Sequence, residues 1–71
     1  MKMRGKELQD IRKNTLRLRQ EQFGNIVGVH FTTISDWERE DKPVPRCAAL
    51  IAMLMADDVI LREKIIGMAG K

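Results

Sequence analysis

The sequence contains few of the residues that most catalytic and metal sites require. Its 71 residues include one histidine, one cysteine and no tyrosine. It has no spaced set of His, Cys and Asp ligands and no glycine-rich phosphate loop following a strand. The sequence therefore predicts neither an enzyme nor a bound metal or cofactor.

Disulfides and long hydrophobic runs are also missing. The single cysteine, Cys47, cannot form an internal disulfide, and no signal peptide is visible, so we expect a cytoplasmic protein. The apolar run of residues 47–56 is about half of the roughly 20 residues that span a bilayer. We interpret Cys47 as a small core residue and expect one domain over residues 1–71.

What the chain does contain is typical of a globular helical protein, with 44% hydrophobic and 32% charged residues. Phe23 and Trp37 are the expected large core residues. Leu8, Ile11 and Thr15 are expected to face inward from the first helix, and each proline in the loop 40–45 disfavours helix at the residue before it. Asp57 is the expected N-cap of the last helix. The predicted fold is all-α, with five helices over about residues 5–15, 20–27, 31–39, 46–55 and 58–68.

Charge is unevenly distributed along the chain. Residues 1–20 contain seven basic and two acidic residues, a net charge of +5, whereas residues 21–46 contain three basic and five acidic residues, a net charge of −2. Residues 47–71 are balanced. The basic segment could neutralise phosphates, although a solvated helix face would have the same composition.

Residues 19–39 contain two short helical patterns joined by a glycine. Phe23 and Val27 are four residues apart and share one face of the first pattern, with Ile26 beside them. Gly28 follows at the point where the chain must turn sharply, because glycine adopts a positive φ at no steric cost. These features are typical of a helix-turn-helix.

The second pattern has an apolar side and a polar side. Ile34 and Trp37 form the inward side. A helix that buries one side and presents short polar groups on the other fits a DNA major groove, although small helical bundles without DNA affinity share this pattern. The outward residues are Phe31, Thr32, Ser35, Asp36 and Arg39.

Three short motifs follow one another within residues 20–39. The chain contains Gln20-Glu21-Gln22-Phe23-Gly24, then Val27-Gly28-Val29, then Thr33-Ile34-Ser35-x-Trp37-Glu38-Arg39. This stretch of about 21 residues resembles, without a gap, the Cro/repressor-type (Xre-type) helix-turn-helix family. Pro43-Val44-Pro45 is similar to the entrance of that family's fourth helix, so the resemblance covers roughly residues 6 to 66. It implies a compact five-helix, lambda-repressor-like DNA-binding domain.

The resemblance also implies roles for individual residues. Gln20 would bind backbone phosphate and brace the recognition helix. Glu38 would pair with a basic residue of the first helix, either Arg12 or Lys13. The base-reading positions would be Phe31, Thr32 and Asp36, with His30 and Ser35 flanking them. We add Arg19, Thr33, Arg39 and Lys42 as candidate phosphate contacts.

The base-reading set is unusual in its chemistry. Phe31 offers no hydrogen bond and would pack on a thymine methyl, whereas ionised Asp36 can only accept and would favour a cytosine amino group. Thr32 can do either. The set lacks the Arg, Gln or Asn that make the commonest bidentate contacts, so water and DNA shape would carry part of the specificity.

The C-terminal third contains more apolar side chains than two helices can bury in one small chain. We expect a homodimer, which suits a palindromic operator, with Ile60, Ile65, Ile66 and Met68 at the interface. The resemblance implies a transcriptional repressor, autoregulatory and of phage or plasmid type. The alternative is a protein-interaction module on the same fold, such as an antitoxin or an inhibitor, which the net negative charge of residues 21–46 favours.

Overall fold

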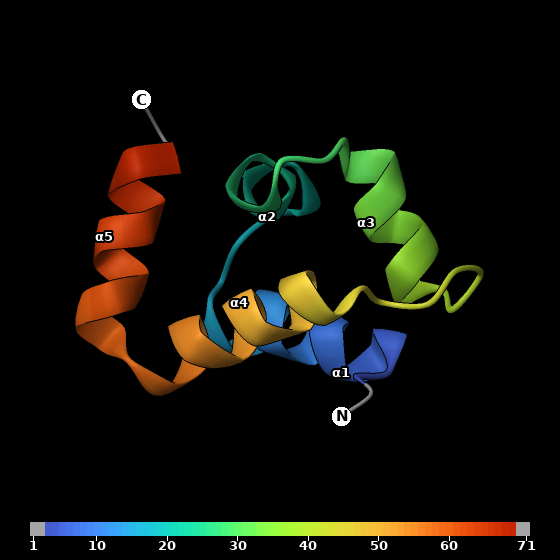
Figure 1. Cartoon of the computed structure of the whole chain (residues 1–71), viewed down its shortest axis with the longest axis horizontal. Coiled ribbons are helices and arrows are strands. Elements are labelled where there is room, and N and C mark those ends of the chain that lie inside the picture. Colours follow the sequence, from blue (N-terminus) through green and yellow to red (C-terminus); the bar gives the residue numbers. More distant parts are fainter. Residues whose placement is uncertain (1–2, 70–71) are drawn as a thin grey trace.

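The computed structural model describes residues 3–69, so Lys2 of the basic N-terminal segment lies outside the described residues. Over the described residues the chain forms five α-helices and one π-helical segment, with no strand (Figure 1). The predicted all-α class is thereby confirmed. The elements are α1 (Gly5–Asp10), η1 (Ile11–Thr15), α2 (Gln20–Val27), α3 (Phe31–Glu38), α4 (Arg46–Asp57) and α5 (Val59–Ala69).

A π turn replaces the second half of the first predicted helix. The amide of Leu16 donates to the carbonyl oxygen of Ile11 over 2.8 Å, five residues back instead of four. Leu16 therefore takes the inward position below Ile11 and is buried. Thr15, predicted to face inward, is exposed, so the prediction of a regular helix was wrong here. Arg17, with a φ of 55°, then ends the helical path.

The turn between α2 and α3 depends on two glycines. Gly28 adopts a left-handed φ of 80°, as its position in the sequence predicts. A Cβ on Gly24 would lie 2.6 Å from the carbonyl oxygen of Val29, closer than side chains tolerate. Gly24 therefore allows the chain to pass directly against α2 on its way to α3.

The core lies where the first four α-helices meet. Leu8 of α1, Phe23 of α2, Ile34 of α3 and Met55 of α4 are completely buried. Trp37 is 6% exposed, so both aromatic residues that were expected in the core lie there. In contrast, no residue of α5 is buried.

The junction of α4 and α5 lies further along the chain than predicted. α4 continues through Asp57, two residues beyond its predicted end. Asp58 is the residue that caps α5, because its Oδ1 accepts a hydrogen bond from the amide of Leu61 at 3.0 Å. The prediction that Asp57 is the N-cap was wrong because Asp57 still belongs to α4.

Cys47 is exposed, which corrects its predicted place in the core. It is the second residue of α4, where the helix has just left the proline-containing loop. The next two residues, Ala48 and Ala49, are the ones turned toward the core, and both are buried.

Candidate nucleic-acid interface

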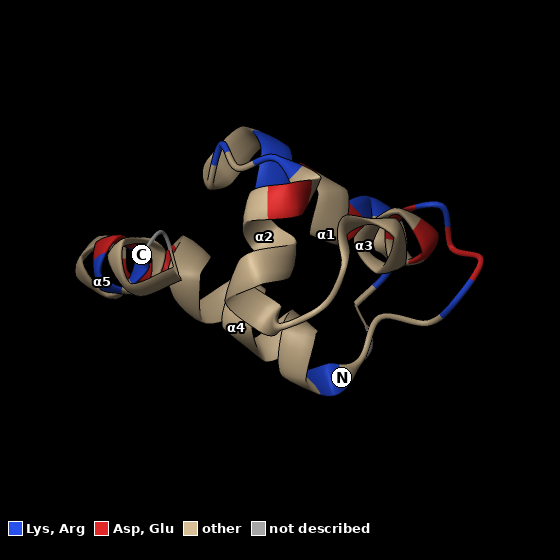
Figure 2. Ribbon diagram, turned by 90° about the horizontal axis from the view of Figure 1, so that it is seen from above, with Lys and Arg blue, Asp and Glu red and all other residues tan. Residues whose placement is uncertain are grey.

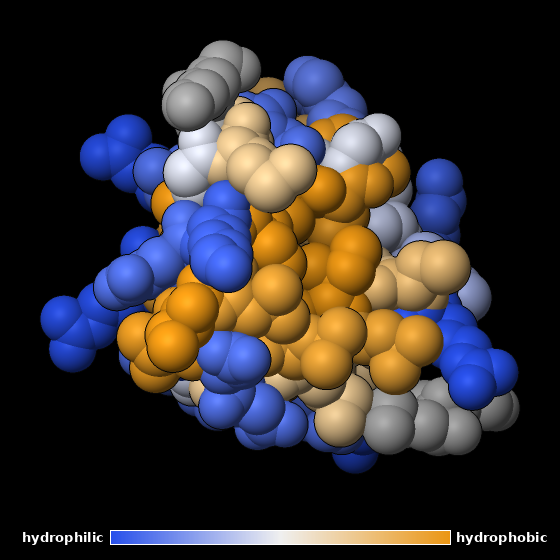
Figure 3. All heavy atoms as spheres, turned by 60° about the vertical axis from the view of Figure 1, so that its left-hand side comes forward, coloured by the Kyte–Doolittle hydropathy of each residue, from blue (hydrophilic) through white to orange (hydrophobic). Residues whose placement is uncertain are grey.

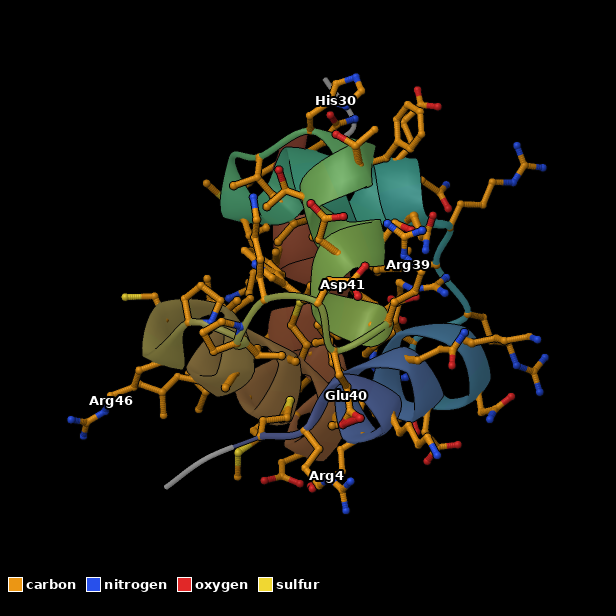
Figure 4. All side chains as sticks on the ribbon, turned by 90° about the vertical axis from the view of Figure 1, so that its right-hand side faces the viewer. Arg4, His30, Arg39, Glu40, Asp41 and Arg46 are labelled. Carbon is orange, nitrogen blue, oxygen red and sulfur yellow. The ribbon has the colours of Figure 1, made fainter. Side chains whose placement is uncertain are left out.

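The outer face of α3 presents the residues that the sequence assigned to base reading. Ile34 and Trp37 are turned inward, while Phe31 is 44% exposed and Thr32 is also exposed. One turn further along, Ser35 and Asp36 are half-buried on the same outer side. Figure 4 shows α3 in front, with His30 at its beginning and Arg39 at its end. The face is therefore continuous along the helix.

His30 caps α3 and contacts the next base-reading candidate. The Nδ1 atom of His30 accepts from the amide of Thr32 at 3.3 Å and lies 2.9 Å from the Thr32 hydroxyl. With Nδ1 as the acceptor for the Thr32 amide, the Thr32 hydroxyl is placed to donate to the same nitrogen. The rings of His30 and Phe31 lie 4.4 Å apart, which places an aromatic pair at the start of the helix.

The inner face of α3 is held by a buried ion pair. Glu38 accepts two hydrogen bonds from the guanidinium of Arg12, one from Nε at 2.5 Å and one from Nη2 at 3.0 Å. The side chain of Glu38 is 3% exposed and that of Arg12 is 9% exposed. Of the two partners left open by the sequence, the structure thus pairs Glu38 with Arg12, while Lys13 is exposed. A bidentate pair of this kind fixes orientation as well as distance.

Two further hydrogen bonds extend this pair into a network. Arg12 Nη1 donates to the carbonyl oxygen of Leu18 at 2.7 Å, and Gln20 Nε2 donates to Glu38 Oε1 at 3.0 Å. The network therefore links η1, the connection to α2, α2 itself and α3. In the described part of the chain, every buried side-chain nitrogen or oxygen has a hydrogen-bond partner. The position of the outer face of α3 is thus set by polar contacts on its inner face.

At the end of α3, two acidic side chains form ion pairs with the basic residues Arg39 and Lys42. Asp36 Oδ1 accepts from Arg39 Nη2 at 2.9 Å, and Asp36 Oδ2 lies 3.8 Å from Lys42 Nζ. Asp41 Oδ2 lies 3.4 Å from Arg39 Nε. Figure 4 shows Arg39 and Asp41 together at this end of the helix. Both carboxylate oxygens of the predicted base reader Asp36 are therefore engaged by cations in the free protein.

The start of α2 carries the other candidate phosphate contacts. Arg19 is exposed and precedes α2 in extended conformation, and Gln20 is half-buried at its first position. Gln22 Oε1 accepts from the amide of Arg19 at 2.8 Å, which caps the helix from inside. Basic ribbon segments gather on η1 and its connection to α2, beside this helix start (Figure 2).

The predicted phosphate contacts therefore form two groups. Arg19 and Gln20 lie at the start of α2, and Arg39 and Lys42 lie at the end of α3, while Thr33 is half-buried within α3. Two contacts at these sites were not predicted from the sequence, namely the cap that Gln22 provides and the ion pair of Asp41 with Arg39. A glutamine three residues after Arg19 was a usable signal for Gln22, whereas no local signal indicates the contact of Asp41 with Arg39.

The residues predicted for a dimer interface fall into two classes. Ile60 and Met68 are 69% and 77% exposed, whereas Ile65 and Ile66 are half-buried and pack against the core of their own chain. Figure 3 shows an extensive apolar surface on the side where α4 and α5 lie. The other large exposed apolar side chains of these helices are Leu50, Leu54 and Val59.

Residues 3–69 contain neither a cluster of metal ligands nor a membrane-spanning helix. No three His, Cys, Asp or Glu side chains in this range come together in a way that could hold a metal ion. None of the described helices combines the length and the hydropathy needed to cross a membrane. In comparisons with known proteins, no protein-family model, curated protein or solved structure matches this chain.

Proposed function

We propose that this chain is a small sequence-specific DNA-binding regulator with a Cro/repressor-type, lambda-repressor-like fold, in which α2, the Gly28 turn and α3 form the helix-turn-helix. The observation that carries the proposal is the two-sidedness of α3. Its inner side is fixed by Ile34, Trp37 and the Arg12–Glu38 pair, and its outer side presents Thr32, Ser35 and Asp36 beside the exposed ring of Phe31. A helix held in this way can lie in a major groove with its orientation already set.

The start of α3 offers a specific readout. The Thr32 hydroxyl lies 2.9 Å from His30 Nδ1, and when it donates to that nitrogen its lone pairs are available to accept from a base amino group, as on adenine N6 or cytosine N4. Phe31, exposed beside it, suits the methyl group of a neighbouring thymine. His30 acts in this proposal by orienting Thr32 and by completing the aromatic pair with Phe31.

The phosphate contacts flank this reading helix. Arg19 and the free backbone amides at the start of α2 suit one phosphate, since a helix N-terminus attracts anions. Gln20 keeps one amide hydrogen free after donating to Glu38, so it can contact phosphate while bracing α3. At the other end of α3, Arg39 and Lys42 approach the opposite side of the groove.

We further propose that two copies associate through α5 and the adjoining part of α4. α5 packs some apolar side chains against the core and leaves others largely exposed, and a large exposed apolar surface commonly marks an interaction site. The exposed side chains of Ile60, Met68 and Leu54 would provide the contact. A two-fold dimer would present two copies of α3 to a palindromic operator, where it would repress by blocking the promoter.

The test is a selection of the purified protein against random duplex DNA at about physiological salt, followed by sequencing. The proposal expects a palindromic consensus with half-site centres about 10 bp apart or a multiple of that spacing. No enrichment at this salt or at lower salt would overturn it. Capture of a protein partner through α5 together with an absence of DNA affinity would support the alternative of a protein-interaction module.

A further inference from the structure

The end of α3 has an arrangement that DNA binding by itself does not require. Its two cations, Arg39 and Lys42, are the candidate phosphate contacts there, and both are held by carboxylates of the same chain. Asp36 contacts Arg39 at 2.9 Å and Lys42 at 3.8 Å, and Asp41 contacts Arg39 at 3.4 Å. We call these four residues the acidic clamp.

The backbone builds the acidic clamp. Glu40 adopts a left-handed φ of 63°, which turns the chain back after α3. The amides of Asp41 and Lys42 then donate to the carbonyl oxygen of Asp36, over 3.0 Å and 3.4 Å. Asp41 and Lys42 are thereby fixed beside the last turn of α3. Arg4 Nε lies 3.4 Å from Glu40 Oε1, and this ion pair connects the turn after α3 to the N-terminal segment.

We propose that the acidic clamp is an intramolecular competitor for DNA phosphate, an inference that rests on the proposed function. In free protein Asp36 and Asp41 occupy the cations that would contact the DNA backbone. On binding, phosphate displaces these carboxylates from Arg39 and Lys42. The side chains of both cations are about two-thirds exposed, so a phosphate can reach them without any change in the fold.

The energetic consequence is a lowered affinity for DNA of any sequence. Exposed ion pairs are weak, so the carboxylates are displaceable, but each one reduces the gain from a phosphate contact. Sequence-independent binding depends chiefly on such contacts and on the counterions they release. The acidic clamp therefore limits the fraction of protein held on DNA outside its operator. It also assigns Asp36 a role other than reading a cytosine.

The experiment measures binding of Asp36→Asn, Asp41→Asn and the double variant to a labelled duplex of mixed sequence over a series of salt concentrations. We expect each single variant to bind about two- to fivefold more tightly than the parent protein, the range that corresponds to the free energy of an exposed ion pair. The double variant should bind more tightly still. Its logarithmic salt slope should stay close to that of the parent protein, because phosphate displaces the carboxylates in both proteins and the number of phosphate contacts is the same.

The matched control is Glu63→Gln on α5, which changes the net charge by the same amount at an exposed position away from α3. It should change affinity much less than Asp41→Asn does. A second control combines Asp41→Asn with Arg39→Ala, where the gain from Asp41→Asn should vanish because the released cation is gone. Equal gains from Glu63→Gln and Asp41→Asn, or a gain that survives the loss of Arg39, would overturn the acidic clamp. Lack of binding by the parent protein and every variant, even at low salt, would overturn the proposed function itself.

Discussion

Gly5, the first residue of α1, lies against the backbone carbonyl oxygen of Trp37 at the end of α3, and a Cβ at this position would overlap that oxygen. The same Cβ would lie 2.9 Å from the carbonyl oxygen of Glu38. The positive end of α1 thus meets carbonyl groups at the negative end of α3 with no side chain between them. Gly5 sets how closely the N-terminal helix approaches the helix of the candidate interface.

The first prediction concerns this close approach. Gly5→Ala should lower the free energy of unfolding by about 1–3 kcal/mol, because rigid backbone atoms would have to move to admit the methyl group. Gly67→Ala is the matched control, since a Cβ there would meet no atom within 4 Å. It should raise stability by up to about 1 kcal/mol. Urea denaturation of both variants measures the difference, and a Gly5→Ala protein as stable as the parent would contradict the described contact.

A second prediction follows from the buried pair of Arg12 and Glu38. Removing either partner, by Arg12→Ala or Glu38→Ala, leaves a buried charge without its counterpart and should cost about 3–5 kcal/mol. The comparison pair is Arg4 and Glu40, whose side chains are 71% and 37% exposed. Breaking that pair should cost about 1 kcal/mol or less. A double-mutant cycle measured by denaturation separates the two, and similar coupling energies for both pairs would show that burial is not the determinant.

The third prediction tests the cap of α3. His30→Ala removes the acceptor for the Thr32 amide and should destabilise the protein by about 1 kcal/mol. His30→Asn should retain most of the stability, because asparagine is a strong N-cap residue. Thermal unfolding of the two variants gives the comparison. If alanine and asparagine were equally stable at this position, the hydrogen bond to Thr32 would contribute nothing.

A fourth prediction separates reading from positioning in the proposed DNA complex. Thr32→Ala should chiefly relax the preference at one base pair of the selected operator, because it removes a base-directed acceptor. Gln20→Ala should weaken binding to every sequence, since it removes both a phosphate contact and the brace to Glu38. Affinities for the operator and its single-base variants are the readout. A uniform loss from both substitutions would contradict the division of roles.

The proposed dimer gives a fifth prediction. Ile60→Ser and Met68→Ser should shift the protein toward the monomer in analytical ultracentrifugation, because both side chains are largely exposed on α5. Lys64→Ser is the control on the same helix, where the exposed side chain is polar. All variants should retain their helical content, since Ile60 and Met68 make no part of the buried core. A parent protein that is monomeric at all concentrations would exclude this mode of association.

The sequence predicted α2, the turn after it and the buried side of α3, because each of these depends on residues that are close together in the chain. The four-residue spacing of Phe23 and Val27 placed α2, the glycine at position 28 placed the turn, and Ile34 with Trp37 placed the buried side of α3. These signals also predicted which face of α3 would be exposed. They could do so because helix periodicity and positive φ are properties of a few consecutive residues.

Other features depend on contacts that the sequence does not display. The π turn at Ile11–Thr15 accompanies the burial of Arg12 and Leu16, and no local residue marks it. The pairing of Asp41 with Arg39 requires the left-handed Glu40, a conformation that glycine would have signalled but glutamate does not. Cys47 was misplaced because a small residue beside an apolar run has no inherent preference for either side of a helix.

The π segment contains one residue more than a regular α-helical turn would hold at this point. The wider π turn accommodates this additional residue within the helix. Arg12 still pairs with Glu38, and the amide of Leu16 still donates to a helix carbonyl oxygen, that of Ile11. A chain shorter by one residue between Lys13 and Thr15 could close the helix regularly and keep the same interface, so length variation at this point is compatible with an unchanged recognition surface.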